Sequence, residues 1–244
     1  MALSYFLEGG AEAERTAREF AAVTDEMQAY LTGLIAERRA APRDDLLTQL
    51  IAAEVDGERL TEEELLGFFQ LLLSAGHETT TNLLSNTILC LLEHPEQLAR
   101  LRADPGLLPL AIEEVLRYRS PVQTMFRVTR RDLPLHGQTI PAGKLVMPMI
   151  GSANRDPRKF PDAHRFDITR DPNPHLAFGH GIHFCIGAPL SRLEARIALG
   201  VFLERVKHFE LASDTPWEPR RAIHVHGPLH LPLRLEPVKP TTRP

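Results

Sequence analysis

Cys185 stands in a run of residues whose types suit chemistry at its sulfur. The run FGHGIHFCIG, residues 178–187, places glycines on both sides of the cysteine, and Pro189, which suits the first turn of a helix, follows it. Helix N-termini favour a thiolate over a thiol, and glycines let a flat ligand approach the sulfur. The pattern therefore predicts a chemically active cysteine. Cys90 lies within the apolar run 88–92 and is expected in the core instead.

Three histidines leave a second interpretation of this loop open. His175, His180 and His183 approach Cys185 along the chain. Imidazole and thiolate groups are common zinc ligands, so these side chains could form a zinc site. Their spacing matches no zinc pattern, and histidines in loops commonly bind water or backbone groups. Zinc therefore stays a minor alternative.

A second group of residues interrupts a long apolar helical pattern. The run AGHETTT occupies residues 75–81. At about 100° per residue, Gly76 and Thr79 share one helical face, whereas Glu78 lies off it. That face then carries a gap and a hydroxyl, beside an acid that could relay protons through water. The alternative is a kink, at which threonine hydroxyls bond to the preceding turn.

Glu114 and Arg117 form a third pattern, a carboxylate and a guanidinium three residues apart in a predicted helix. Such pairs are common on helix surfaces, where each contributes roughly a few tenths of a kcal/mol. By itself this spacing predicts a solvated ion pair.

Periodicity and helix breakers predict the elements that position these residues. Helices are expected over 11–41, after Asp44 as far as residues 56–57, from the capping box Thr61–Glu64 to Pro95, and over 95–102, 107–118 and from about Pro189. The last helix carries an apolar stripe of Leu190, Leu193, Ile197, Val201 and Phe202. Hairpins are expected within 123–150 and 222–235, and loops over 151–180. The expected fold class is mainly α with small β-hairpins.

Composition and charge exclude several classes of protein. The chain has 244 residues, of which 43% are hydrophobic and 25% charged, as in an ordinary globular protein. A net charge of −4 argues against nucleic acid or an anionic membrane as partner. The longest apolar stretch, residues 65–75, is too short to span a bilayer, and the start MALSYFLEGG is no convincing signal peptide. With only two cysteines, we expect a cytoplasmic protein.

Taken together and in this order, the motifs resemble the cytochrome P450 family of haem-thiolate monooxygenases, in its soluble bacterial form. Residues 178–187 resemble its cysteine-ligand loop, residues 75–79 its oxygen-activation motif, and Glu114 with Arg117 its E-x-x-R pair. Arg165, the run 153–157 and Phe126-Arg127 are further matches. The resemblance covers about residues 15–235. It implies a single partial domain over 1–244, the C-terminal portion of the P450 fold, without the N-terminal part of the family's domain.

The resemblance also implies a role for each matching residue in binding the cofactor. Cys185 would be the axial ligand of the iron in haem b, and Arg127 and His183 would hold the haem propionates. Phe178, Gly179 and Gly187 would complete the cofactor-binding loop.

Further roles concern catalysis and structure. Gly76 would leave room for dioxygen, Thr79 would hydrogen-bond it, and Glu78 would help to deliver protons. The remaining residues, Glu114, Arg117 and Arg165, would form a structural network that fixes the cysteine loop.

The activity implied is the insertion of one oxygen atom into a small organic substrate, with electrons from a ferredoxin- or flavodoxin-type partner. Arg192 and Arg196, which follow the cysteine loop, could attract an acidic partner or simply lie on a solvated helix face. The alternative function is a haem-binding module without turnover, such as a truncated or degenerate product, a carrier or a sensor, which needs Cys185 but neither Glu78 nor Thr79.

Overall fold

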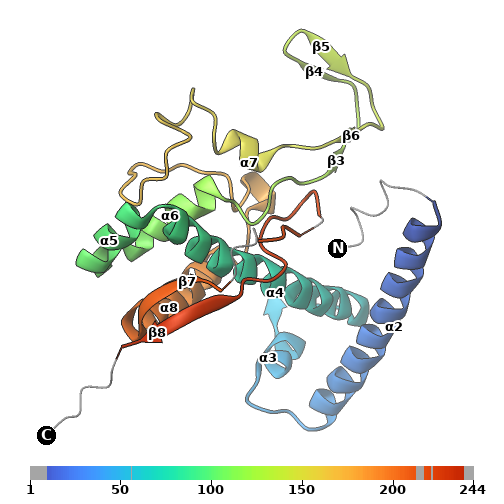
Figure 1. Ribbon diagram of the computed structural model, residues 1–244. Helices are drawn as coiled ribbons and strands as arrows, with labels where there is room; N and C mark the ends of the chain where they lie inside the picture. Colours follow the sequence, from blue (N-terminus) through green and yellow to red (C-terminus); the bar gives the residue numbers. More distant parts are fainter. Residues whose placement is uncertain (1–9, 56, 213–216, 221, 239–244) are drawn as a thin grey trace, which may run out of the picture. The chain divides into compact units, whose positions relative to one another are not determined.

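The computed structural model describes residues 10–55, 57–212, 217–220 and 222–238 (Figure 1). Contacts between residues divide the chain into two compact units, Met1–Glu78 and Thr79–Pro244. The long helix α4 (Glu62–Glu93) contributes residues to both units. The single domain expected from the sequence stays a prediction.

The first unit is helical. It contains α2 (Gly10–Ala40), α3 (Leu46–Ala52), the two-residue antiparallel strands β1 (Glu54–Val55) and β2 (Glu58–Arg59), and the first half of α4. The predicted capping box begins α4: the Thr61 N–H donates to the Glu64 carboxylate (2.9 Å), and the Glu64 N–H donates to the Thr61 hydroxyl oxygen (3.2 Å). The core of this unit consists of Leu31, Ile35, Leu65 and Phe69.

The second unit holds the remaining helices. They are α5 (Pro95–Ala103), the 3₁₀ turn η1 (Pro105–Leu107), α6 (Leu108–Tyr118), the short α7 (Ile150–Ala153), the 3₁₀ turn η2 (Gly181–His183) and α8 (Ala188–Arg205). Side chains from α4, α6, α8 and the segment 166–168 form its main core, which includes Leu91, Ile112, Val115, Phe166 and Leu199. In the part of the chain that the structure describes, no helix is both long and apolar enough to cross a membrane.

The sheets of the second unit are small antiparallel pairs. Strand β3 (Arg127–Val128) pairs with β6 (Leu145–Val146), and β4 (Leu133–Leu135) pairs with β5 (Gln138–Ile140), as the hairpin prediction for 123–150 requires. The hairpin of β4 and β5 extends from the strands that flank it (Figure 1). The helix-rich fold with small sheets confirms the expected fold class.

The predicted hairpin over 222–235 is wrong. Strand β8 (Leu233–Pro237) pairs with β7 (Val206–Leu211), which follows α8 directly. Strand β7 buries Val206 and Phe209 in the core, whereas Pro228 and Pro232 lack the N–H that a strand ladder needs. Strand β8 therefore pairs with β7, which is distant in sequence, and residues 222–235 do not form a hairpin of their own.

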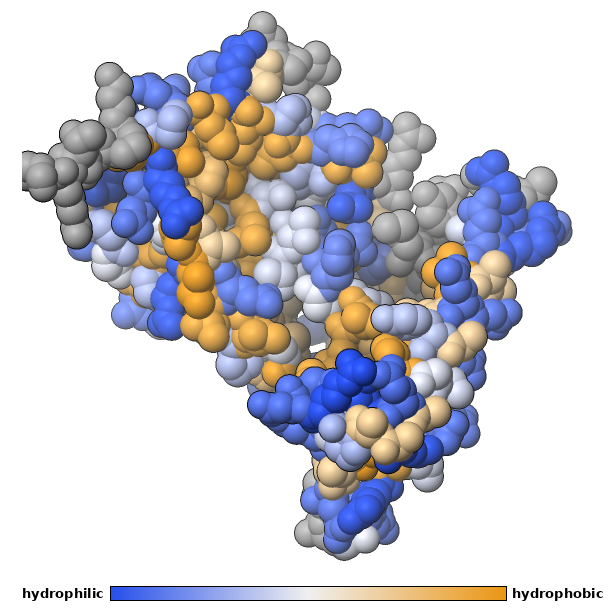
Figure 2. Space-filling view, turned by 90° about the horizontal axis from the view of Figure 1, so that it is seen from below, coloured by the Kyte–Doolittle hydropathy of each residue, from blue (hydrophilic) through white to orange (hydrophobic). Residues whose placement is uncertain are grey.

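The apolar stripe of α8 is also not the buried face of that helix. Four of its five members are 40–58% exposed: Leu190, Leu193, Ile197 and Val201. The helix instead buries Ala188, Ala195 and Leu199, where it packs against α6 and β7. Small alanines allow close helix packing, but they carry a weaker periodic signal than the larger residues of the stripe. The space-filling view shows hydrophobic residues gathered at the surface on the face that it draws (Figure 2).

Candidate functional site

The Cys185 loop, defined here as residues 175–187, is closed by its own backbone. The Cys185 N–H donates to the Phe178 carbonyl (2.9 Å), and the Cys185 carbonyl accepts from the Ala188 N–H (3.2 Å) at the start of α8. Gly179 and Gly181 have φ angles of 76° and 71°, a left-handed conformation that side chains other than glycine adopt at a cost. The glycines therefore let the chain double back and present Cys185 ahead of α8.

The Cys185 thiol is free and exposed. Its neighbours Ile182, Phe184 and Ile186 are also exposed, and Ile182 is 98% exposed. Cys90, in contrast, is buried in the core, and burial raises the pKa of its thiol to about 12. Only Cys185 is therefore accessible to an external ligand. An exposed thiol among apolar side chains fits a flat, largely apolar group such as haem, to whose iron the sulfur would supply a ligand.

The zinc alternative is not supported. Among the described residues, no three His, Cys, Asp or Glu side chains lie together in a way that could hold a metal ion. His175 turns instead toward Glu113, with 3.0 Å between its Nε2 and a carboxylate oxygen. His180 and His183 are exposed.

The other residues predicted to bind the cofactor lie near the surface of the second unit. Arg127 is exposed in β3, and its guanidinium donates to the Phe126 carbonyl (2.8 Å). His183 ends η2, and Gly187 is the N-cap residue of α8. Phe178 is half-buried, with its ring centroid 6.4 Å from that of Phe184. That these residues bind one cofactor stays a prediction.

The residues predicted to handle dioxygen and protons lie in the middle of α4, which is helical without interruption. Gly76 is exposed, and a Cβ built there meets nothing within 4 Å, so the predicted gap in the helix surface exists. Glu78 and Thr79 are half-buried. Their orientation toward Cys185 stays a prediction.

Glu114 and Arg117 are completely buried, both with 0% exposure, and are not the solvated pair that their spacing alone predicts. Arg117 donates two parallel hydrogen bonds to the Glu114 carboxylate (2.7 and 2.8 Å). Its N–H groups also donate to the carbonyls of Asn154 (2.9 Å), Ala163 (2.8 Å) and Arg165 (3.0 Å). One guanidinium thus joins α6 to the segment 154–165, because a buried charge needs a partner for each donor.

Two further side chains reach the Glu114 carboxylate, those of Arg170 and Asn173, whereas the predicted Arg165 contributes its carbonyl and not its side chain. The Arg165 side chain is 64% exposed and lies 4.0 Å from Asp167. A turn closed by the Arg165 N–H and the Asp162 carbonyl (2.8 Å) presents the Arg165 carbonyl to Arg117 and leaves the side chain outside. Arg170 instead approaches the Glu114 carboxylate, with 3.2 Å between Nε and Oε2.

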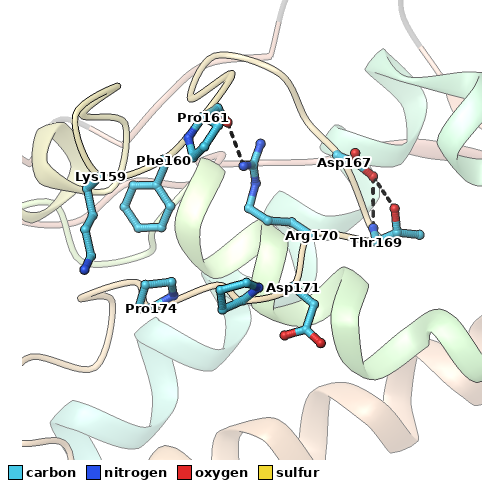
Figure 3. A pocket seen from close by; sticks show the side chains of 9 residues that line it. Lys159, Phe160, Pro161, Asp167, Thr169, Arg170, Asp171 and Pro174 are labelled. Carbon is cyan, nitrogen blue, oxygen red and sulfur yellow. Dashed lines mark hydrogen bonds between the residues drawn. The ribbon is translucent and has the colours of Figure 1, made fainter.

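A pocket of about 440 Å³ lies beside this network. Its lining comes from residues 159–161, 167, 169–172 and 174, and Arg170 donates across it to the Pro161 carbonyl (2.8 Å; Figure 3). Asp167 accepts from the Thr169 N–H and hydroxyl at another part of the lining (Figure 3). Neither Cys185 nor any other residue predicted to bind the cofactor lines this pocket.

Asn154 connects the buried pair to the Cys185 loop, a role that sequence reasoning missed. It is completely buried, and its side chain accepts from the Leu176 N–H (2.7 Å) and donates to the Ser120 hydroxyl (2.9 Å). The Leu176 carbonyl in turn accepts from the Gly179 N–H (2.8 Å). The only sequence signal was its place in the run 153–157.

Comparison with known proteins identifies the family. A family model described as cytochrome P450 matches residues 13–105 and 106–226. Cytochrome P450 107B1 of Saccharopolyspora erythraea is 52% identical over 212 residues, which cover 85% of this chain and 52% of that protein. The cytochrome P450 monooxygenase PikC of Streptomyces venezuelae is 50% identical, over 86% of this chain and 51% of its own length. The chain therefore spans about half the length of the curated relatives that it matches.

A solved structure gives the same result for the fold. Cytochrome P450 CYP109Q5 from Chondromyces apiculatus aligns with a TM-score of 0.83 and 48% identity, over 93% of this chain and 57% of that one. The helices and small sheets described above are thus a partial P450 fold. The family model, which matches most of the chain, and relatives that are about 50% identical show that the chain belongs to the cytochrome P450 family.

Proposed function

We propose that this chain binds haem b through Cys185 and acts as a monooxygenase, inserting one atom of dioxygen into a small organic substrate. The observation that carries the proposal is the free, exposed thiol of Cys185 at the end of a glycine-rich loop in a P450 fold. PikC, one of the relatives, is named as a monooxygenase, which supports the same reaction type here.

The Cys185 sulfur, as a thiolate, would be the protein ligand of the iron. Haem with such a ligand supplies the activation of dioxygen. Arg127 and His183, both exposed, have N–H groups that can donate hydrogen bonds to the propionate carboxylates. Phe178 and the backbone of Gly179 and Gly187 would shape the loop around the bound group.

Three residues of α4 would leave room for dioxygen and deliver protons to it. The open surface at Gly76 would admit dioxygen, since no side chain fills it. The Thr79 hydroxyl would donate a hydrogen bond, and the Glu78 carboxylate would pass protons from solvent. In the proposed reaction one oxygen atom would enter the substrate, and the other would leave as water, with two protons delivered along this path and two electrons from a redox partner.

A ferredoxin- or flavodoxin-type protein would supply the electrons. We place the reaction in the cytoplasm, which the free thiols of Cys90 and Cys185 support.

The absorption spectrum of the reduced, carbon-monoxide-bound protein after addition of haem tests this proposal. We expect the strongly red-shifted band of a thiolate complex, and we expect Cys185→Ser to abolish it without loss of helical content. Cys90→Ala is the matched control, because that thiol is buried, and it should keep the band. A red-shifted band that persists in Cys185→Ser would overturn the ligand assignment.

The effect of Thr79→Ala distinguishes a monooxygenase from the alternative, a haem-binding module without turnover. In a monooxygenase this variant should still bind haem but should divert electrons to peroxide. The measurement is product formed per electron consumed with a panel of small organic substrates. An unchanged ratio would argue against the proton path through Thr79, and the absence of any product would favour the module without turnover.

A further inference from the structure

Glu113 precedes the buried Glu114 on α6, but it forms a separate cluster. Its Oε1 accepts a hydrogen bond from Arg192 Nε (2.7 Å), and its Oε2 accepts one from Arg192 Nη2 (2.8 Å). The same Oε2 lies 3.0 Å from Nε2 of His175. One carboxylate therefore contacts α8, through Arg192, and the start of the Cys185 loop, through His175.

The hydrogen bonds of His175 define its role. Its side chain is only 3% exposed, and its Nδ1 accepts from the Ala177 N–H (3.2 Å). An acceptor nitrogen carries no proton, so the ring proton lies on Nε2 and is donated to Glu113. His175 thus needs an acceptor at this place, and a carboxylate on α6 supplies it.

Arg192 also contacts a second residue of the loop, Phe178. Its guanidinium carbon lies 4.5 Å from the centre of the Phe178 ring, a cation–π arrangement. The Phe178 carbonyl is the acceptor of the Cys185 N–H. The pKa of Arg192 is raised, above all by its hydrogen bonds to Glu113, and nearby Cys185 contributes to the rise. Arg192 is therefore engaged within the fold, which accounts for it without an acidic partner.

We propose that Glu113 is a positioning residue for Cys185: it holds His175 and Arg192, and through them it attaches residues 175 and 178 of the Cys185 loop to α6 and α8. That the positioned sulfur is a haem ligand rests on the proposed function. The loop's own backbone bonds close it locally but do not attach it to α6. The Glu113 cluster and Asn154 are side-chain links that do.

Hydrogen exchange of the haem-free chain tests this positioning directly. The readout is the exchange rate of the Gly179 and Cys185 amides, relative to buried helical amides of α6 and α8. We expect Glu113→Gln to raise this ratio at least tenfold. The glutamine side chain lacks the negative charge that pairs with Arg192, and its N–H₂ group would face Arg192 or His175, which are themselves donors. Glu194→Gln, at an exposed position of α8, is the matched control and should leave the ratio unchanged.

Arg192→Lys is the second variant, and it tests whether the cluster positions the Cys185 loop if Glu113→Gln does not fold. Lysine keeps the charge but cannot make the two parallel hydrogen bonds, so the ratio should again rise. A change below twofold in a folded Glu113→Gln and in Arg192→Lys would overturn the proposal.

A haem measurement then distinguishes this proposal from the proposed function. With haem added, the share of protein that shows the red-shifted band of the reduced carbon-monoxide complex should fall severalfold in Glu113→Gln and stay unchanged in Glu194→Gln. If the unsubstituted chain shows no such band, the proposed function fails, and the exchange ratios still decide whether Glu113 positions the loop.

Discussion

Glu114 and Arg117 are completely buried and hydrogen-bonded, whereas Cys185 is exposed with a free thiol. Both regions belong to the second compact unit. In the first, the Glu114–Arg117 pair lies within α6, and its further hydrogen bonds join α6 to distant segments such as residues 154–170. In the second, apolar side chains such as Ile182 lie open to the surface.

The two regions therefore differ in how much their side chains contribute to the stability of the fold and in how accessible they are. Buried charges that are paired and hydrogen-bonded hold the segments in one arrangement, and removing one partner leaves the other uncompensated. An exposed loop contributes little to stability, so its side chains are available for a ligand. Variants in the two regions should therefore differ in what they damage.

The largest loss of stability is expected for Arg117→Ala. This change leaves the Glu114 carboxylate buried beside fewer cations and removes the donor of three carbonyls, so we expect a loss of about 3–5 kcal/mol in the free energy of unfolding. Urea unfolding followed by circular dichroism measures it. Arg158→Ala removes a surface pair with Asp156 and should change stability by less than about 0.5 kcal/mol. A loss below about 1 kcal/mol in Arg117→Ala would contradict the comparison.

A smaller loss is expected for Asn154→Ala, which breaks the link between the two regions. The Leu176 N–H and the Ser120 hydroxyl each lose a partner, and an unsatisfied buried group costs about 1–3 kcal/mol. Hydrogen exchange at Leu176 should accelerate more than exchange in α4. If Leu176 exchanged at the original rate, Asn154 would not hold the loop.

The pH dependence of stability should report the Glu113 cluster. Burial raises the pKa of Glu113, but the hydrogen bonds from Arg192 and His175 outweigh it and lower the pKa from 4.5 to about 2. Because the folded-state pKa is depressed, the stabilisation is present above pH 4.5 and is lost as the pH falls towards 2. The carboxylate is 25% exposed and partly screened, so we expect a contribution of about 1–2 kcal/mol.

The difference between the unsubstituted chain and Glu113→Gln isolates this contribution from other titrating groups. Urea unfolding at a series of pH values measures it. The stability gap between the two proteins should narrow as the pH falls through this range. A gap that stays constant with pH would contradict the assignment.

The smallest effect on stability is expected for Cys185→Ser. The side chain is exposed, so the free energy of unfolding should change by less than about 0.5 kcal/mol. Urea unfolding in the absence of haem measures it. A loss comparable to that of Arg117→Ala would show that the loop has a structural role, and the distinction between the two regions would fail.

Sequence reasoning predicted the local features well because they depend on neighbouring residues. The capping box at Thr61 and Glu64, the start of α8 near Pro189 and the glycine turns before Cys185 arise from interactions within a few residues. Most helix bounds follow for the same reason, but the helix expected to reach residues 56–57 ends at Ala52, because the chain forms the paired strands β1 and β2 there. The roles proposed for Cys185, Thr79 and the residues around them came from their spacing and the family resemblance, and they await the experiments above.

The amino-acid sequence by itself determined the helices, the glycine-rich loop and the set of residues available for chemistry. Only the tertiary structure decided that Glu114 and Arg117 are buried, that the side chain of Arg170 rather than that of Arg165 joins them, and that β8 pairs with β7. It also decided which face of α8 lies in the core. These features depend on contacts between segments far apart in the chain, whose energies no local spacing encodes, because burial changes the cost of a charge and the choice of its partner.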